Sequence, residues 1–431
     1  MDVVGGLVLV VFIGTYVVIS TEKVNRTATS LFGMGLVGII LWAALGSPFR
    51  VLIEHIDWHI VLFVTAMMMI VTIASSSGMF QYLALTFAQP TRANTRQLFI
   101  AFLAFVFGIS LVLDTTSTML IMAPLTIELC KSLEVDFRPF LISEAVVCNF
   151  ASIPSIVGAV PNLVIAEQTL LDQGLLFLTA MPLAIILFFV SLPIFLHYFD
   201  VVLQQGEEEL VDQLLVINPQ AMIRSRRDFY ASIVAILILI ASFTLGHSVG
   251  LAPSMIAIVV ASFLLMFSRE WVDDILKKVN WGTVFFLIGL FGLVAALDLT
   301  GIIAEIGEGV QSFIGGNEFF AVVFMIWVPG LLSAVIDNIP ISAVVAPIAV
   351  ELAPISPLLP IALIFAVNVG GFILPIGCPA NILAMAFAEK EHRPISMIEF
   401  AKIATPLGFL ILAIGTGWFL LIAYLMNLIG L

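Results

Sequence analysis

The stretch Val335–Leu352 reads VIDNIPISAVVAPIAVEL and places a carboxylate where the surrounding chain is almost wholly apolar. Asp337 and Asn338 stand side by side, with Pro340 two residues after the asparagine. Of the 431 residues, 61% are hydrophobic and only 10% are charged, and the mean hydropathy is +1.19. Apolar segments long enough to cross a bilayer, about 20 residues each, recur from Val3 to Leu428. The sequence therefore predicts an integral membrane protein built from α-helices.

Charge and composition exclude several other classes of protein. The net charge of -13 argues against nucleic acid as a partner. The three cysteines and five histidines show no spacing typical of a metal centre, and no pairing of a nucleophile with a base is evident. We therefore expect no cofactor, no catalytic residue and no enzymatic activity.

An internal repeat relates the two halves of the chain. The segment IDWHIVLFVTAMMMIVTIASSSGM aligns with VNWGTVFFLIGLFGLVAALDLTGI, so that Trp58 falls on Trp281, 223 residues later. The same offset, or one four residues shorter, brings polar residues into register. These matched pairs are Asp114 with Asp337, Asn149 with Asn368, and Asn162 with Asn381.

The basic residues predict that the two repeats have opposite orientations, because Lys and Arg gather in cytoplasmic loops. We assume that the N-terminus lies outside and that segments 97–130 and 318–352 are hairpins that enter and leave on one side. Every cluster of basic residues then falls inside, and Arg50 alone falls outside. The C-terminus is also outside. Each inverted repeat would contain five spanning helices, one of them broken, and one re-entrant hairpin, giving about 10 or 11 transmembrane helices.

These boundaries divide the chain into three parts. The first inverted repeat covers 1–199, an acidic cytoplasmic linker covers 200–227, and the second repeat covers 228–431. The linker contains QQGEEELVDQLLVINPQ, for which we expect a surface helix; a regulatory role is the alternative.

Four polar interruptions in the apolar segments predict a transport site. Two are the hairpin tips at Asp114 and Asp337, and two are broken helices that begin near Asn149 and Asn368. Irregular backbone at membrane depth is tolerated only where it is buried in protein or lines a cavity. Inverted repeats with broken helices are typical of secondary transporters, which bind substrate and coupling ions near the midplane.

The two tip aspartates indicate ion chemistry. Each stands where a helix would begin, and an aspartate cap stabilises a helix by about 1 kcal/mol. A carboxylate inside a membrane costs at least about 2.5 kcal/mol, which capping alone does not offset. Thr115 and Thr116 add neutral oxygens, for which hydrogen bonding between helices is the alternative role. Because the aspartates neutralise the positive field of the helix N-termini, we expect a neutral or cationic substrate over a multivalent anion.

The segments LDTTSTMLIMAPLTIELC, LSAVIDNIPISAVVAPIAVEL, GAVPN and GCPAN resemble the arsenite permease and sodium/proton antiporter family (ArsB/NhaD type) of the ion transporter superfamily. Its P protein-like branch is the most similar. The resemblance implies the fold of the dicarboxylate transporters, an elevator mechanism, a homodimer and a prokaryotic plasma membrane location. The site positions that it implies are Asp114, Thr115, Asp337 and Asn338 at the tips and Asn149, Asn162, Asn368 and Asn381 in the broken helices.

The first half departs from the family pattern. The family has Asp-Asn at the first tip, where this chain has Asp114 and Thr115. The glycines and the acid usual in the first broken helix are replaced by Ala151, Ser152 and nearby residues. We expect a first ion site that is weakened or altered in stoichiometry.

The sequence thus predicts a secondary active transporter, driven by protons or sodium, that exports a small inorganic ion such as arsenite or sodium. Sodium-coupled uptake of an anion or dicarboxylate and a passive ion channel are the alternatives. The predicted substrate and coupling residues are Asp114, Thr115, Thr116, Asn149, Asn162, Asp337, Asn338, Asn368 and Asn381. The predicted sodium ligands among them are Asp114, Asn162, Asp337, Asn338 and Asn381.

Overall fold

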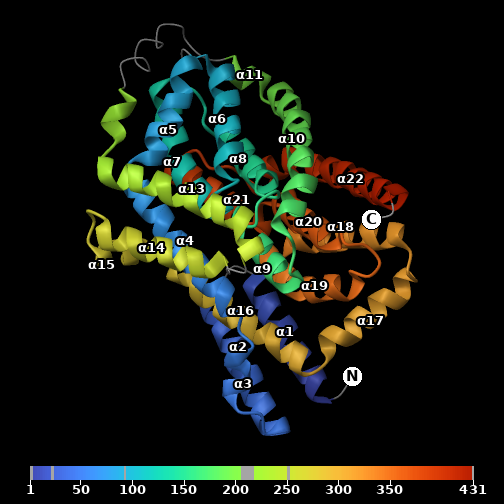
Figure 1. Ribbon diagram of the computed structural model, residues 1–431. Helices are drawn as coiled ribbons and strands as arrows, with labels where there is room; N and C mark the ends of the chain where they lie inside the picture. Colours follow the sequence, from blue (N-terminus) through green and yellow to red (C-terminus); the bar gives the residue numbers. More distant parts are fainter. Residues whose placement is uncertain (1–2, 21–23, 92–93, 205–217, 250–252, 430–431) are drawn as a thin grey trace.

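The computed structural model describes residues 3–20, 24–91, 94–204, 218–249 and 253–429. Within these ranges the chain folds into helices and contains no strand (Figure 1). The all-α class predicted from composition is confirmed. Residues 205–217 of the predicted linker lie outside the described residues.

The first half contains helices of very different lengths and a 3-10 turn at Gln89–Thr91. In chain order its α-helices are α1 (Val3–Ser20), α2 (Arg26–Leu45), α3 (Phe49–Glu54), α4 (Trp58–Ser76), α5 (Met79–Ala88), α6 (Thr95–Ile109), α7 (Thr115–Ser132), α8 (Arg138–Ala151), α9 (Val160–Thr169), α10 (Gln173–Tyr198) and α11 (Asp200–Leu203).

The second half follows the same order after a 3-10 turn, η3, at Pro219–Met222. Its α-helices are α13 (Arg226–Val249), α14 (Pro253–Phe267), α15 (Val272–Lys278), α16 (Trp281–Leu299), α17 (Ile302–Ile314), α18 (Glu318–Val335), α19 (Asn338–Leu352), α20 (Leu359–Ile373), α21 (Pro379–Lys390) and α22 (Met397–Ile429). A further 3-10 turn, Pro375–Gly377, lies between α20 and α21.

Six of the described helices are long and apolar enough to cross a membrane. They are α2, α4, α10, α16, α18 and α22. Five shorter apolar segments, in α1, α6, α14, α19 and α20, add to them. Their length and composition fit a polytopic membrane protein; which side each loop faces stays a prediction.

Helix starts recur between the halves with the same side-chain chemistry. Asp57 caps α4 by accepting from the Ile60 amide at 3.3 Å, and Asn280, 223 residues later, caps α16 at 3.2 Å. Asn94 caps α6 at 2.9 Å, and Asn317 caps α18 at 3.3 Å. Each cap satisfies an amide that the first helical turn leaves unpaired. The repeated sequence therefore produces repeated local structure, whereas the inversion of the repeats stays a prediction.

Breaks at Gly78 and Gly301, which the sequence analysis did not predict, separate α4 from α5 and α16 from α17. Both glycines have the left-handed backbone conformation, with φ of +84° and +74°, which residues with a side chain rarely adopt. The first break is covered, because the Arg224 amide donates to the Ser77 carbonyl at 2.9 Å, whereas a Cβ built on Gly301 would meet no described atom within 4 Å. The end of the linker is thereby fixed against the first repeat.

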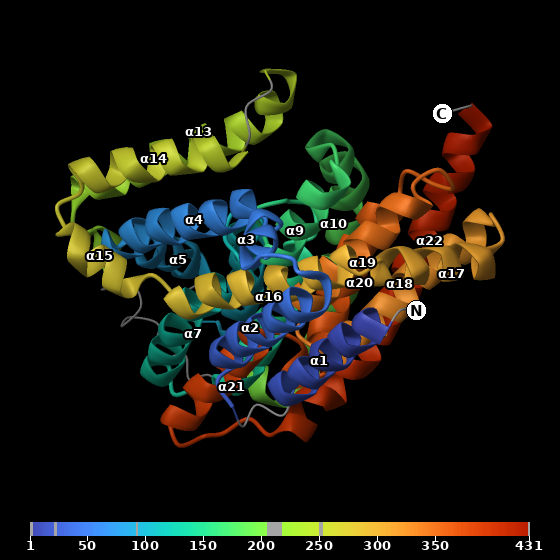
Figure 2. The ribbon, with the colours of Figure 1, turned by 90° about the horizontal axis from the view of Figure 1, so that it is seen from below.

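The predicted hairpins coincide with two helix pairs, α6 with α7 and α18 with α19, each interrupted at its aspartate. Their return helices cross over: α7 packs against α21, and α19 packs against α9. Every residue of α20 is buried, as is all of α8 after its first residue. Around this core, α1, α2 and α16 lie side by side (Figure 2). The hairpin tips and the broken helices therefore meet in the protein interior.

Candidate functional site

The first hairpin tip is organised by Asp114, which begins α7. Its carboxylate accepts hydrogen bonds from the Thr116 and Ser117 amides at 3.0 and 3.1 Å, and from the Ser117 hydroxyl. Among the described residues it has no ion pair. The capping role weighed from the sequence is thus present, and one charged carboxylate remains without a cationic side chain bound to it.

The second tip has a different arrangement around Asp337, which begins α19. Its carboxylate accepts from the Ile339 amide at 3.1 Å, and its other oxygen binds Nη1 of Arg26 at 3.3 Å. The guanidinium also lies over the ring of Phe286, 5.5 Å from its centroid. Sequence reasoning missed this role of Arg26, because 311 residues separate it from Asp337 and no local pattern links them.

Two asparagines form side-chain hydrogen bonds to the backbone at the helix breaks. The side-chain amide of Asn162, at the start of α9, donates to the carbonyls of Ser152 and Ser155 at 2.9 and 2.8 Å. Asn381, at the start of α21, donates to the two corresponding carbonyls of the second break at 2.8 and 3.3 Å. The asparagines thus add side-chain hydrogen bonds to turn carbonyls of the two breaks, several of which also accept a backbone amide.

The repeats also meet through their asparagines, but unequally. Asn368 donates to the Asn162 side-chain oxygen at 2.6 Å, which joins α20 to α9. The matching pair is Asn149 and Asn381, and here the side-chain oxygen of each is buried without a hydrogen-bond donor. A buried unpaired acceptor costs about 1 to 3 kcal/mol, so such a group calls for an explanation.

The Asn149 oxygen lies near a second asparagine side chain at Gly371 in the second broken helix. A Cβ built on Gly371 would lie 3.3 Å from Oδ1 of Asn149 and 3.4 Å from Nδ2 of Asn338. The Gly371 carbonyl binds the amide of Asn381 at 2.8 Å. Asparagines from α8, α19 and α21 therefore lie around one glycine, where a larger side chain would fit only if these neighbours shifted. Oxygen atoms of this kind are ligands for hard cations.

Thr115 connects the first tip to the second broken helix. Its hydroxyl lies 3.6 Å from the sulfur of Cys378, the residue that precedes α21. Both side chains are buried. The first tip thus contacts the opposite repeat, as the packing of α7 on α21 requires.

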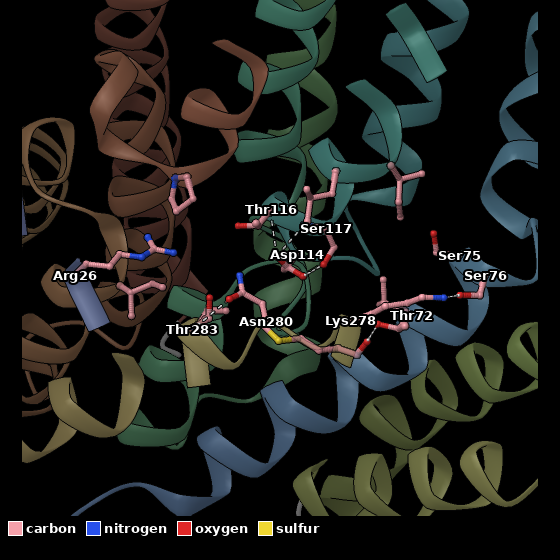
Figure 3. A pocket seen from close by; sticks show the side chains of 17 residues that line it. Arg26, Thr72, Ser75, Ser76, Asp114, Thr116, Ser117, Lys278, Asn280 and Thr283 are labelled. Atoms are coloured by element: carbon pink, nitrogen blue, oxygen red, sulfur yellow. Dashed lines mark hydrogen bonds between the residues drawn. The ribbon is translucent and has the colours of Figure 1, made fainter. Parts of the chain in front are cut away.

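A cavity of about 230 Å³ opens beside the first tip. Figure 3 shows Asp114, Thr116 and Ser117 on one side of it, with Arg26 and Lys278 at separate edges. The Lys278 ammonium binds Ser76 at 3.0 Å and the Glu270 carboxylate at 3.1 Å. Further polar lining comes from Thr72, Ser75, Asn280 and Thr283. The polar part of the lining therefore consists of hydroxyls, the Asn280 amide, one carboxylate without an ion pair and two basic groups that have acidic partners, and apolar side chains complete the wall.

The structure brings the nine predicted site residues to the two tips and the two helix breaks, but it places them at different depths. Asp114 and Thr116 line the cavity. The four asparagines of the broken helices are fully buried behind it. The predicted sodium set includes Asn162, whose oxygen is already hydrogen-bonded, and omits Asn149, whose oxygen is not. Their roles in binding stay predictions.

Several cavity residues were not predicted from the sequence. Lys278 and Asn280 read there as loop residues, and the serines near α4's end read as part of an apolar span. These residues lie at helix ends in the segments that contain the repeated Trp58 and Trp281, which is the one feature of the sequence that could have pointed to them. They are far from the hairpin tips along the chain, so the sequence did not show that they line the same cavity.

Apolar helices around a polar interior fit an integral membrane protein, and the comparison with known proteins gives its class. Residues 16–362 match the family described as citrate transporter. The chain belongs to that family, and it is therefore a transporter and not an enzyme.

Relatives cover nearly the whole chain. It is 28% identical over 403 residues to the 46 kDa membrane protein of Mycobacterium leprae, covering 92% of this chain and 94% of that protein. It is 27% identical over 399 residues to an uncharacterized transporter of Mycobacterium tuberculosis, covering 91% and 92%. It is 26% identical over 498 residues to the human P protein, covering 95% of this chain and 59% of that protein. The P protein named from the motifs is thus a relative, and the family match does not decide between arsenite and sodium.

Proposed function

We propose that the protein is a secondary active transporter in which a proton or a sodium ion drives the movement of a small solute. The observation that carries the proposal is the pair of buried, unpaired oxygens of Asn149 and Asn381 at the junction of the tips and the broken helices. A bound cation is one group that would satisfy such an oxygen. The tip carboxylates Asp114 and Asp337 would supply the charge that couples the cation to movement.

The first candidate substrate is a small inorganic species, arsenite or sodium, that is exported. The small cavity and the hydroxyls among its lining residues support a compact, hydroxylated or cationic solute. Both bases at its edges are already paired with acids, whereas Asp114 is not. The elevator motion and the homodimer belong to this proposal and rest on the motif resemblance.

A second candidate is cation-coupled uptake of a small carboxylate, as the family description implies. Arg26 and Lys278 both line the cavity, and they favour it. The first residues of α7, α9, α19 and α21 also border it, and helix N-termini attract anions. This binding mode would require the bases to leave their acidic partners.

Flux into proteoliposomes with an imposed proton or sodium gradient tests the proposal. Arsenite, sodium, lithium, citrate and succinate are offered separately to the wild-type protein, with empty liposomes as the control. We expect one of these solutes to accumulate against its own gradient only when the cation gradient is present. Arsenite or sodium would support export, and citrate or succinate would support the second candidate. Flux that always follows the solute's own gradient would instead indicate a passive channel.

A further inference from the structure

We propose that Arg26 is a built-in cation that occupies Asp337 in the unloaded transporter, so that the coupling cation must displace it to bind. This inference rests on the proposed function. It adds that Arg26 competes with the coupling cation for the carboxylate of Asp337. Nη1 of Arg26 lies 3.3 Å from the carboxylate, whose side chain is only 13% exposed. A guanidinium at this distance supplies charge-assisted hydrogen bonding that another cation has to replace.

The guanidinium is held by elements other than the hairpin. Arg26 is the first residue of α2, and the next residue, Thr27, donates its hydroxyl to the Gly282 carbonyl of α16 at 2.8 Å. The ring of Phe286, also on α16, lies beneath the guanidinium. Asp337 belongs to the second hairpin, which packs against α9 and α20. The ion pair therefore joins the α2 and α16 pair to the hairpin tip, and displacing Arg26 would release that connection.

The first repeat's tip has no such competitor. The start of α14 contacts α4 of the first repeat through the Ser254 hydroxyl, which lies 3.1 Å from Nδ1 of His59. Asp114 is bound by local amides and a hydroxyl, with no ion pair among the described residues. The two tips are thus unequal: one carboxylate is free for a cation, and the other is already occupied.

Few other groups act on Asp337. Tyr16 of α1 and Cys378 lie within electrostatic range of its carboxylate, and neither is cationic. Arg26 is therefore the one basic side chain placed to neutralise it among the described residues. Because Arg26 also lines the cavity, a displaced guanidinium remains next to the solute, where it can bind solute oxygens.

Neutralising Arg26 tests the competition. In the Arg26→Gln variant we expect the sodium or proton concentration for half-maximal flux to fall at least about threefold, because the competing charge is gone. Arg26→Lys keeps a charge and should stay nearer to the wild type. Arg227→Gln is the matched control, since Arg227 also lies at a helix start over a phenylalanine ring, at 5.8 Å, but away from the site. An unchanged or raised half-maximal concentration in Arg26→Gln would overturn the inference.

The wild-type protein provides a second measurement that does not depend on how the variants fold. Phenylglyoxal modifies accessible arginines, and mass spectrometry gives the rate at each one. We expect sodium chloride, against choline chloride, or a lower pH to speed the modification of Arg26 relative to Arg227. An equal or slower relative rate under every condition that supports flux would contradict displacement. If the wild type shows no cation-coupled flux with any solute, the proposed function itself fails, whatever the modification rates are.

Discussion

Asp337→Asn and Asp114→Asn should each reduce gradient-driven solute flux by at least about 100-fold, while the protein still folds. Asparagine caps a helix about as well as aspartate, so the starts of α7 and α19 should persist. What the substitution removes is the negative charge that binds a proton or metal cation. Without it, the cation gradient no longer acts on the solute, and a loss of this size corresponds to about 2.7 kcal/mol of coupling.

The controls for this prediction lie on the same two helices. Glu128→Gln and Glu351→Gln make the same chemical change near the ends of α7 and α19, away from the tips, and should keep most of the flux. Flux is measured in proteoliposomes with equal amounts of folded protein, as judged by size-exclusion chromatography. Wild-type coupling in both tip variants would show that the aspartates serve only as helix caps.

Gly370→Ala should cost about 3 kcal/mol or more of folding free energy, because α18 and α20 approach each other closely at this point. A methyl group there would lie 2.1 Å from the Gly330 carbonyl oxygen and 2.8 Å from Cβ of Ser333. The first contact is with a backbone atom, which, unlike a side chain, cannot adopt another rotamer to relieve the clash. We expect a large loss of folded protein in detergent and a lower melting temperature.

Gly108→Ala is the matched control for this substitution. Gly108 lies in α6, the first-repeat counterpart of α18, and a methyl group there meets nothing within 4 Å. Its stability should stay within about 0.5 kcal/mol of the wild type. Equal melting temperatures for the two variants would show that the contact between α18 and α20 is looser than the structure indicates.

The helix starts and helix breaks could be predicted from the sequence, because neighbouring residues in the chain determine them. An aspartate before an apolar run predicts a helix start, and both tips have one. Proline, glycine and asparagine together predict broken helices, and α8 and α20 end where those residues gather. Asn162 and Asn381 then tie the broken backbone by hydrogen bonds to residues only 7 and 10 positions away.

Other features depend on contacts between segments far apart in the chain. The ion pair of Arg26 and the hydrogen bond between Asn368 and Asn162 each span more than 200 residues. Repeat matching would predict a second bond between Asn149 and Asn381, yet their oxygens remain unpaired. The two tips differ because Arg26 forms an ion pair with Asp337, whereas Asp114 has no ion pair among the described residues. Only the packed structure reveals which carboxylate already has a cation.

The most direct test of cation-coupled transport is the solute gradient at which net flux through the wild-type protein reverses. Proteoliposomes are loaded with the transported solute, a fixed proton or sodium gradient is imposed, and the external solute concentration is varied. Our account predicts that the reversal point moves away from the solute's own equilibrium, in the direction set by the cation gradient. Reversal at that equilibrium, whatever cation gradient is imposed, would contradict it and would identify an uncoupled pore.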